Sequence, residues 1–351
     1  MQMNAYVQKV LRYCLVAVCC AGVGFASAQT ATKKPRIAFI SSAKSSSKWW
    51  DPVKNGIAQA AEDFGVDVDF ITPADGELDG MIKIINEIDP SKYAAVVSTM
   101  PNPGRLRNPL AAMVKEKRLP LITTNSGTQE DSEAVGAILH VGQPEELAGR
   151  LAGEQARKAG ATSFVCIVRS VDNAATKQRC EGFAKGLGVA GPVAMFEPQG
   201  KDAEAEASIA KFIEGAGPVN SILTTGLNEA IATMGYLRKS KNSKKPHLVT
   251  FDLSKEVATG VTSGLMDFAI DQQPYLQGYL PVAVLARKLK YPEESALLLQ
   301  IGLFSENKLH VRASKYGLSL KPSNGRHILS GPAFVTRLNV DKVDQYIGQY
   351  R

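Results

Sequence analysis

The sequence has 351 residues, of which 44% are hydrophobic and 21% are charged, and its formal net charge is +7. A chain of this length exceeds what one hydrophobic core usually supports, so we expect two domains, and we find no short-period repeat or low-complexity linker. The basic excess is spread along the chain, and its densest run, residues 238–245, indicates a solvated helix end instead of a nucleic-acid contact.

The first 28 residues have the layout of a secretory signal peptide. Lys9 and Arg12 precede an apolar run over residues 15–25, and an A-x-A cleavage site follows at residues 26–28. The apolar run is too short to span a bilayer comfortably. We therefore expect cleavage after Ala28 and release into the periplasm, with an uncleaved anchor as the alternative.

From residue 36 onward, strand-like and helix-like segments alternate. Asp51 and Pro52 have the residue types of an N-cap and a first helical residue, and Gly65 ends the helix that they begin. We expect strands at residues 36–42, 66–71, 93–99 and 119–124, and helices at 52–64, 78–88 and 106–117. These three βα units predict a parallel sheet covered by helices on both faces.

A second series of the same kind follows the turn at residues 125–127. We expect helices at residues 145–158, 174–187, 203–214 and 229–238, and strands at 163–168, 193–196, 219–224 and 247–251. A strand at 268–270 and a helix at 274–290 come next, followed by short strands at 296–304 and 328–336 and a last helix near 341–347. The fold class is α/β, with two doubly wound, Rossmann-like parallel-sheet lobes.

Polar side chains recur where the predicted strands end. They are Ser42 with Lys48, Trp49 and Trp50 just after it, Asn125 and Ser126, Lys177 within residues 170–177, Gly226 and Asn228, Asp252, and Gln272. Taken singly, most such residues are caps or turn formers. Parallel strands, however, aim their carboxyl ends at one edge of a sheet, where open α/β folds bind ligands. The shared position therefore predicts a site for a polyhydroxylated ligand, although one tryptophan could instead belong to the core.

The cysteines do not decide whether one disulfide forms, and the histidines predict no metal site. Cys166 lies in a predicted strand and Cys180 on the helix that follows, and a bond between them is as compatible with the sequence as two free thiols. The four histidines, at positions 140, 247, 310 and 327, show no ligand spacing.

Catalytic motifs give little support to an enzyme. The literal G-x-G-x-x-G at residues 186–191 follows a predicted helix and precedes a strand, which is the wrong order for a phosphate-binding turn. It is better explained as the end of a helix. The sequence has no G-x-S-x-G, H-E-x-x-H or P-loop motif, and we predict no cofactor.

Taken together, residues 36–42, 124–125, 180–183, 251–252 and 271–275 resemble the ribose/galactose-type periplasmic binding proteins, the type I solute receptors of ATP-binding-cassette (ABC) importers. The stretch Gln272-Gln273-Pro274-Tyr275 is the most specific piece. The resemblance implies two lobes joined by three crossover strands, with a sugar closed between them. On this basis we expect an N-terminal lobe of residues 34–127 and 274–328, and a C-terminal lobe of residues 128–270 and 332–351.

The resemblance also implies roles for single residues. Trp49 and Trp50 match the paired aromatic residues that sandwich the sugar ring. Asp252 matches the hydroxyl-binding aspartate of the family, and Gln272 matches the glutamine of the hinge strand.

Other positions depart from the family pattern. Asn125 stands where the family usually has aspartate, Ser126 where many members have arginine, and Lys177 where an arginine of the C-terminal lobe is usual. The expected asparagine after the strand at 219–224 is displaced, with Gly226 or Leu227 in its place and Asn228 nearby. These changes imply a different sugar, a polyol or another small polar solute.

The function implied is that of a monomeric exported protein, not an enzyme, that delivers its solute to an ABC permease in the inner membrane and has no nucleic-acid partner. A periplasmic sensory receptor that presents its ligand to a chemoreceptor or a sensor kinase shares this architecture and is the alternative.

Overall fold

A computed structural model describes residues 33–42, 47–171, 173–200, 202–241, 244–321 and 325–351. The predicted signal peptide therefore lies outside the described residues. Within the described ranges, no helix combines the length and the apolar composition that crossing a membrane requires.

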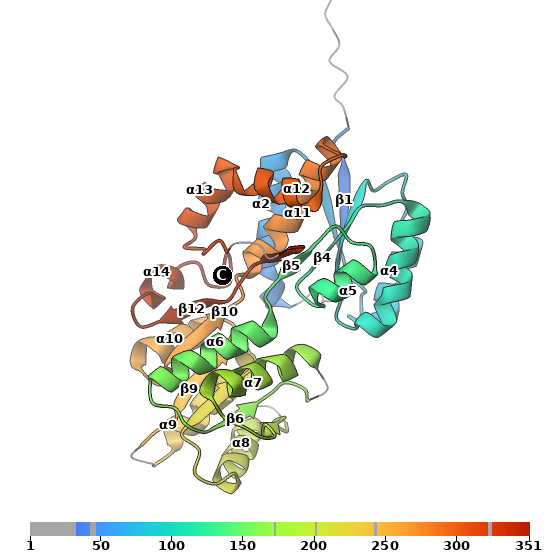
Figure 1. Ribbon diagram of the computed structural model, residues 1–351. Coiled ribbons are helices and arrows are strands. Elements are labelled where there is room, and N and C mark those ends of the chain that lie inside the picture. Colours follow the sequence, from blue (N-terminus) through green and yellow to red (C-terminus); the bar gives the residue numbers. More distant parts are fainter. Residues whose placement is uncertain (1–32, 43–46, 172, 201, 242–243, 322–324) are drawn as a thin grey trace, which may run out of the picture. The chain divides into compact units, whose positions relative to one another are not determined.

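The first sheet has six strands, all parallel, in the order β11-β5-β4-β3-β1-β2 (Figure 1). Its strands are β1 (Arg36–Ile40), β2 (Asp67–Ile71), β3 (Ala95–Thr99), β4 (Leu121–Thr124), β5 (His140–Gly142) and β11 (His327–Leu329). Side chains alternate between the two faces of a strand. Phe39 therefore packs with helices α2 (Asp51–Phe64) and α11 (Pro274–Lys290), and Ile40 packs with α3 (Leu78–Glu87) and α4 (Pro103–Lys117).

The second sheet also has six strands, in the order β12-β10-β9-β8-β6-β7. They are β6 (Phe164–Ile167), β7 (Met195–Phe196), β8 (Ser221–Thr224), β9 (His247–Phe251), β10 (Phe268–Asp271) and β12 (Ala333–Thr336), and β12 alone among them pairs antiparallel. One face is covered by α8 (Ala203–Gly215), α9 (Leu227–Lys239), α10 (Lys255–Ser263) and α14 (Val340–Asp344), the other by α6 (Glu145–Lys158) and α7 (Ala174–Leu187). The prediction of two doubly wound α/β units is confirmed.

The chain passes between the sheets where β5 leads into α6, where β10 leads into α11, and where β11 leads into β12. The first sheet continues beyond residue 127, where we expected it to end, because it also contains β5. This strand is short and contains His140 and Gly142, so it lacks the apolar signature of the other strands. The intervening helix α5 (Gln129–Ala134), which begins with a capping box from Thr128 to Asp131, was also not predicted.

The prediction of a strand at residues 296–304 is wrong, because this segment is helix α12 (Ala296–Phe304), and α13 (Asn307–Lys315) follows it. A short apolar run does not distinguish a strand from a buried helix by its period alone. Ser295 caps the helix by accepting a hydrogen bond from the Leu298 amide, and Leu299 and Leu303, four residues apart, are buried on one face.

Glycines bring α6 and α7 into backbone contact. A methyl group on Gly149 or Gly153 would clash with a carbonyl oxygen of α7, and one on Gly182 or Gly186 would clash with a carbonyl oxygen of α6. Gly188, with φ of 84°, then ends α7, so the interpretation of residues 186–191 as a helix end is confirmed.

Candidate functional site

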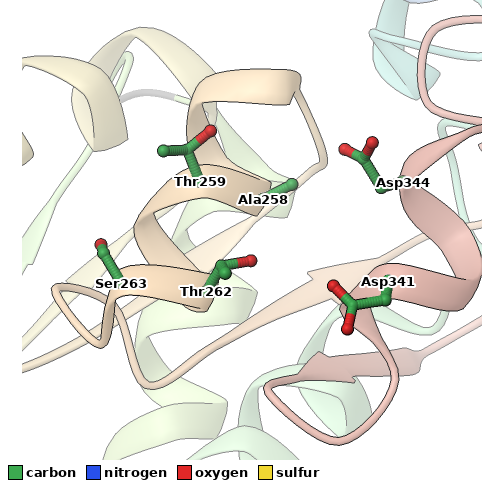
Figure 2. A pocket seen from close by; sticks show the side chains of 6 residues that line it. All are labelled: Ala258, Thr259, Thr262, Ser263, Asp341 and Asp344. Atoms are coloured by element: carbon green, nitrogen blue, oxygen red, sulfur yellow. The ribbon is translucent and has the colours of Figure 1, made fainter.

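One hollow of the surface lies away from the strand ends. It has a volume of about 430 Å³ and lies between α10 and α14 (Figure 2). It is lined by Ala258, by three short hydroxyl side chains of α10 and by Asp341 and Asp344, and it contains none of the predicted site residues. Asp344 is already paired with Lys255. Several of the predicted polar residues lie instead where the strands of the sheets end.

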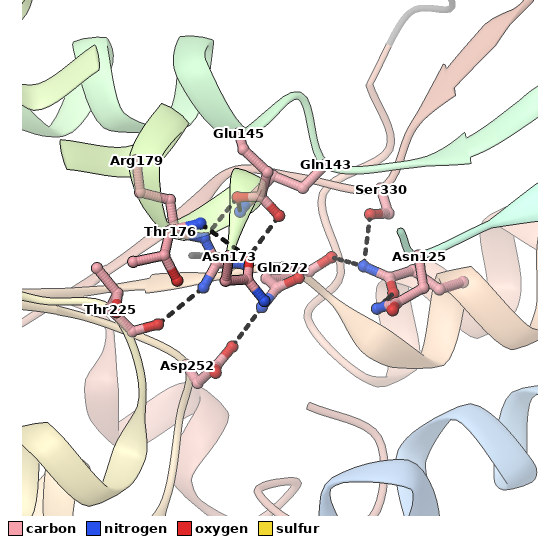
Figure 3. A network of polar contacts seen from close by, with 11 residues as sticks. Asn125, Gln143, Glu145, Asn173, Thr176, Arg179, Thr225, Asp252, Gln272 and Ser330 are labelled. Atoms are coloured by element: carbon pink, nitrogen blue, oxygen red, sulfur yellow. Dashed lines mark hydrogen bonds and ion pairs between the residues drawn. The ribbon is translucent and has the colours of Figure 1, made fainter. Parts of the chain in front are cut away.

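Two predicted residues meet at the end of the second sheet. Asp252 directly follows β9 and Gln272 directly follows β10, and these strands are neighbours. The Gln272 side-chain amide donates a 2.6 Å hydrogen bond to the Asp252 carboxylate (Figure 3). Asp252 has φ of 70°, a left-handed conformation that aspartate tolerates better than most residues. The adjacent ends of two parallel strands thus position one carboxylate and one amide together.

The surroundings of the Asp252 carboxylate influence its pKa in opposite directions. Burial raises its pKa above the ordinary 3.8, while the positive charge of Arg179 and hydrogen bonds from Gln272 and the Trp49 side chain act in the opposite direction. Burial is the stronger influence, so the pKa is raised overall. Trp49 precedes α2 of the first sheet, so groups from both sheets act on this one carboxylate.

Arg179 is the main residue that the sequence reasoning missed. Its guanidinium forms a fork with Glu145, with N···O distances of 2.7 and 2.8 Å, and donates to the Thr225 carbonyl at 2.8 Å (Figure 3). It also lies over the Phe251 ring, 4.4 Å from the ring centroid. This buried arginine thereby ties the starts of α6 and α7 to the ends of β8 and β9.

Lys177, the residue that we predicted from the resemblance, lies on the same helix but is exposed. The difference follows from helix geometry, since residues two apart point in different directions. An acidic residue in the first turn of α6, Glu145, was the available signal for a buried basic partner, but sequence alone does not pair residues 34 positions apart.

Asn125 is held at the end of β4 in the first sheet. Its side-chain amide donates a 2.8 Å hydrogen bond to the side-chain carbonyl oxygen of Gln277, and the side-chain amide nitrogen of Gln277 donates to Ser330 Oγ at 3.1 Å (Figure 3). Gln277 is fully buried in α11, whose residues Pro274 to Ala286 are all buried. A lone glutamine among apolar helix residues was the signal for this contact, because a buried amide needs partners.

The two tryptophans lie in the short 3₁₀ helix η1 (Lys48–Trp50), directly before α2. Both are half-buried, and their rings meet edge to face with centroids 5.2 Å apart. Trp50 also lies 6.0 Å from the Phe70 ring on β2. Both rings therefore pack partly against the core between the first sheet and helices α2 and α11, and the Trp49 side chain acts to lower the pKa of Asp252. Lys48 beside them is exposed, and Ser42 is half-buried.

The remaining predicted residues are less closely associated with Asp252. The Ser126 hydroxyl accepts a 3.0 Å hydrogen bond from the Met100 amide. Asn228 is exposed in the first turn of α9, while the next residue, Glu229, is buried. Gly226 precedes this helix, and a methyl group there would lie 2.8 Å from the Glu229 carboxylate. Burial raises the pKa of Glu229, which makes it a second perturbed carboxyl at these strand ends.

Cys166 of β6 and Cys180 of α7 form a disulfide, with S–S of 2.03 Å and a Cα–Cα distance of 6.1 Å. The bond fixes α7 to the sheet that it covers. Because Arg179 is the residue before Cys180, the disulfide also holds the backbone that presents the guanidinium to Glu145.

The fold has known counterparts. A solved carbohydrate transporter from Acidothermus cellulolyticus 11B, in complex with myo-inositol, is 21% identical and has a TM-score of 0.69, with 90% of this chain and 99% of that chain covered. GanP, a glucose-galactose binding protein from Geobacillus stearothermophilus, is 16% identical with a TM-score of 0.66, covering 88% and 99%. XylFII, in the XylFII-LytSN complex, is 23% identical with a TM-score of 0.62, covering 74% and 94%. Because these sequence identities are low, the similarity shows a shared fold and nothing more specific.

The sequence itself also matches a family. No curated protein matches the chain by sequence. The family model of the periplasmic binding protein domain, however, matches residues 37–293, which is more than half of the chain and includes both strand ends that carry Asp252 and Gln272. The chain therefore belongs to the periplasmic binding protein family.

Proposed function

We propose that this protein is an exported receptor that captures a sugar, a polyol or a similarly small polar solute and delivers it to an ABC importer in the inner membrane. The observation that carries the proposal is the set of groups on Asp252. A strand-end amide from Gln272, the Trp49 side chain and the charge of Arg179 all act on this single carboxylate. A carboxylate and an amide can hold hydroxyl groups, and an indole face packs against the C–H groups of a sugar ring.

The solved relatives agree with this class of ligand. One is described in complex with myo-inositol, and another as a glucose-galactose binding protein. Both kinds of ligand are uncharged and carry hydroxyl groups around a ring. In this chain, Asn125, Gln272 and Asp252 supply amide and carboxylate groups of the type that such hydroxyls require.

Binding would work by shifting an equilibrium between open and closed arrangements of the two lobes. A solute that contacts Asp252 from the second sheet and Trp49 from the first gains both sets of contacts only when the lobes are closed. Micromolar affinity corresponds to about −8 kcal/mol, and part of the gross contact energy is spent on closing. The receptor would release its solute chemically unchanged.

One observation favours a second role. XylFII is described in a complex with LytSN, so a protein of this fold is known in an assembly with another component. In that role, the closed, solute-bound form would be presented to a sensor instead of a permease. A gene located beside permease and ATPase genes supports the importer, whereas a gene located beside a sensor kinase supports the sensor.

A thermal-shift screen of sugars and polyols, followed by calorimetry, tests the proposal. A specific solute raises the melting temperature by mass action, and chemical analysis of the solute after incubation should recover it unchanged. Asp252→Asn should then weaken binding by about 1.5–3 kcal/mol, because a solute hydroxyl loses its charged acceptor.

Asp341→Asn is the matched control, because Asp341 is an aspartate in the hollow between α10 and α14. It should leave the affinity unchanged. If Asp341→Asn abolishes binding while Asp252→Asn does not, the solute binds in that hollow and the strand-end site is wrong. Conversion of the solute during incubation would establish an enzyme instead.

A further inference from the structure

A second hollow, of about 320 Å³, lies beside two of the connections between the sheets. Pro332, on the connection from β11 to β12, and Ala333, the first residue of β12, line one part of it. Arg351 lines another part and forms an ion pair with Asp271, the last residue of β10, with an N···O distance of 2.6 Å. The hollow contains none of the residues that we assign to the solute site.

The charged side chains that line this hollow are all basic. They are Lys321, which follows α13, Lys342 on α14, and Arg351. Because Arg351 and Asp271 are both buried and paired, their charges balance each other. Among the described residues, no acidic side chain lies within ion-pair distance of Lys321 or Lys342. Two uncompensated positive charges from different segments therefore border one concave space.

The polar framework of the hollow is held in place by hydrogen bonds. The Asn339 side chain accepts from the Thr336 amide at 2.8 Å and donates to the Phe334 carbonyl at 2.9 Å. On the opposite segment, the Ser319 amide donates to the Gln273 side chain at 2.6 Å. The walls that carry the two lysines are thus fixed to β12 and to the residue after Gln272, which favours a preformed concavity.

We propose that this hollow binds a small multivalent oxyanion, carrying phosphate or several carboxylates. An ammonium group acts as a point charge that donates in several directions, so two lysines that line one hollow suit an anion with more than one charged oxygen. The volume is at the lower end of the range for small-molecule sites, which restricts the ligand to a compact anion. Because the lysines are not deeply buried, binding weakens as the salt concentration rises.

Calorimetry of the purified protein with inorganic phosphate, and separately with citrate, tests this site at low ionic strength. Chloride at matched ionic strength serves as the baseline. We expect saturable binding of at least one of the two anions, and the stronger of them identifies the tetrahedral or the carboxylate form of the ligand. The variant Lys321→Ala/Lys342→Ala should weaken that binding by about tenfold or more, as expected for the loss of two charge-assisted contacts.

The matched control is Lys115→Ala/Lys158→Ala, which removes the same charge from two exposed positions on α4 and α6. It should bind the anion as the unmodified protein does. The proposal is overturned if neither anion produces heat beyond that of chloride, or if both double variants lose binding equally. Solute affinity is measured separately on the same proteins, so failure of the anion site leaves the solute site untouched.

Discussion

Asn125 and Asp252 occupy corresponding places in the two sheets. Asn125 follows β4, the third strand in the order that begins with β11, and Asp252 follows β9, the third strand in the order that begins with β12. Both residues have a left-handed backbone, with φ of 67° and 70°. Asparagine and aspartate adopt this conformation more readily than other residues with a side chain. The same turn chemistry therefore places one polar side chain at the corresponding edge of each sheet.

The raised pKa of Asp252 predicts that this carboxylate, which we assign to solute binding, lowers the stability of the folded protein when it is ionised. Burial favours the protonated form in the folded state, so the folded protein is penalised at pH values above the folded-state pKa. Asp252→Asn keeps the left-handed backbone and removes the ionisable group. We expect the variant to unfold at higher urea concentration than the wild type at pH 7. This advantage should shrink as the pH falls through the raised pKa and vanish at or below about 3.8, the ordinary value.

Urea unfolding without solute, at intervals from pH 3.5 to 8, measures this effect. A variant that is less stable at pH 7, or an advantage that does not change with pH, would contradict the assignment of Asp252 as a buried, disfavoured carboxylate. The same preparations can be used for solute binding, where the variant should be the weaker binder.

Arg179 and Lys177 should differ in their contributions to the free energy of unfolding. Arg179→Met removes one partner of a buried ion pair and leaves Glu145 uncompensated, so we expect a loss of about 3–5 kcal/mol in unfolding free energy. Lys177→Met removes an exposed charge and should change stability by less than about 0.5 kcal/mol. If Lys177 contacts the solute, its substitution lowers affinity alone.

Chemical denaturation and calorimetry of the two variants separate these roles. Equal stability of Arg179→Met and the wild type would show that the fork with Glu145 does not hold the second sheet together. An unchanged affinity of Lys177→Met would remove Lys177 from the site.

The contact between α6 and α7 predicts a strong effect of one added methyl group. Gly153→Ala would place that group against the Phe183 carbonyl of the opposite helix, and overpacking of this kind costs about 1–3 kcal/mol. Gly215→Ala, at the end of α8, meets no atom within 4 Å and should be neutral or slightly stabilising. Thermal unfolding of the two variants measures the difference. A tolerated alanine at position 153 would show that the helices can separate at little cost.

Most of the fold could be predicted from the sequence because each βα unit carries its own local signals. Apolar strand runs, Pro52 in the first turn of a helix and Gly65 at its end all act within a few residues. The prediction of Asp51 as the N-cap is wrong, because Asp51 is the first helical residue and Trp50, which makes no side-chain capping hydrogen bond, precedes it. Prediction failed where the deciding contact is distant. Helix α12 and strand β5 have ambiguous local patterns, and tertiary packing decides their structure.

In the candidate site, too, local sequence signals could be used for prediction and distant contacts could not. That Asp252 and Gln272 lie together could be predicted because each stands directly after a strand, a position that the sequence shows. Arg179 was missed because its role depends on Glu145 and on the Thr225 carbonyl, which are remote in sequence. Glu229 was missed in favour of its neighbour Asn228, since the direction of a side chain in the first turn of a helix depends on where that helix begins.

The two tryptophans should report solute binding unequally. The chain contains no others, so Trp50→Phe leaves Trp49 as the sole indole and Trp49→Phe leaves Trp50. Trp49 influences the pKa of Asp252, whereas the Trp50 ring lies beside Phe70. We therefore expect the emission of Trp50→Phe to change on titration with the solute, with a smaller change in Trp49→Phe and a weaker affinity. Emission that stays flat in both variants, with a solute that calorimetry shows to bind, would place the solute away from η1 and remove the aromatic pair from the site.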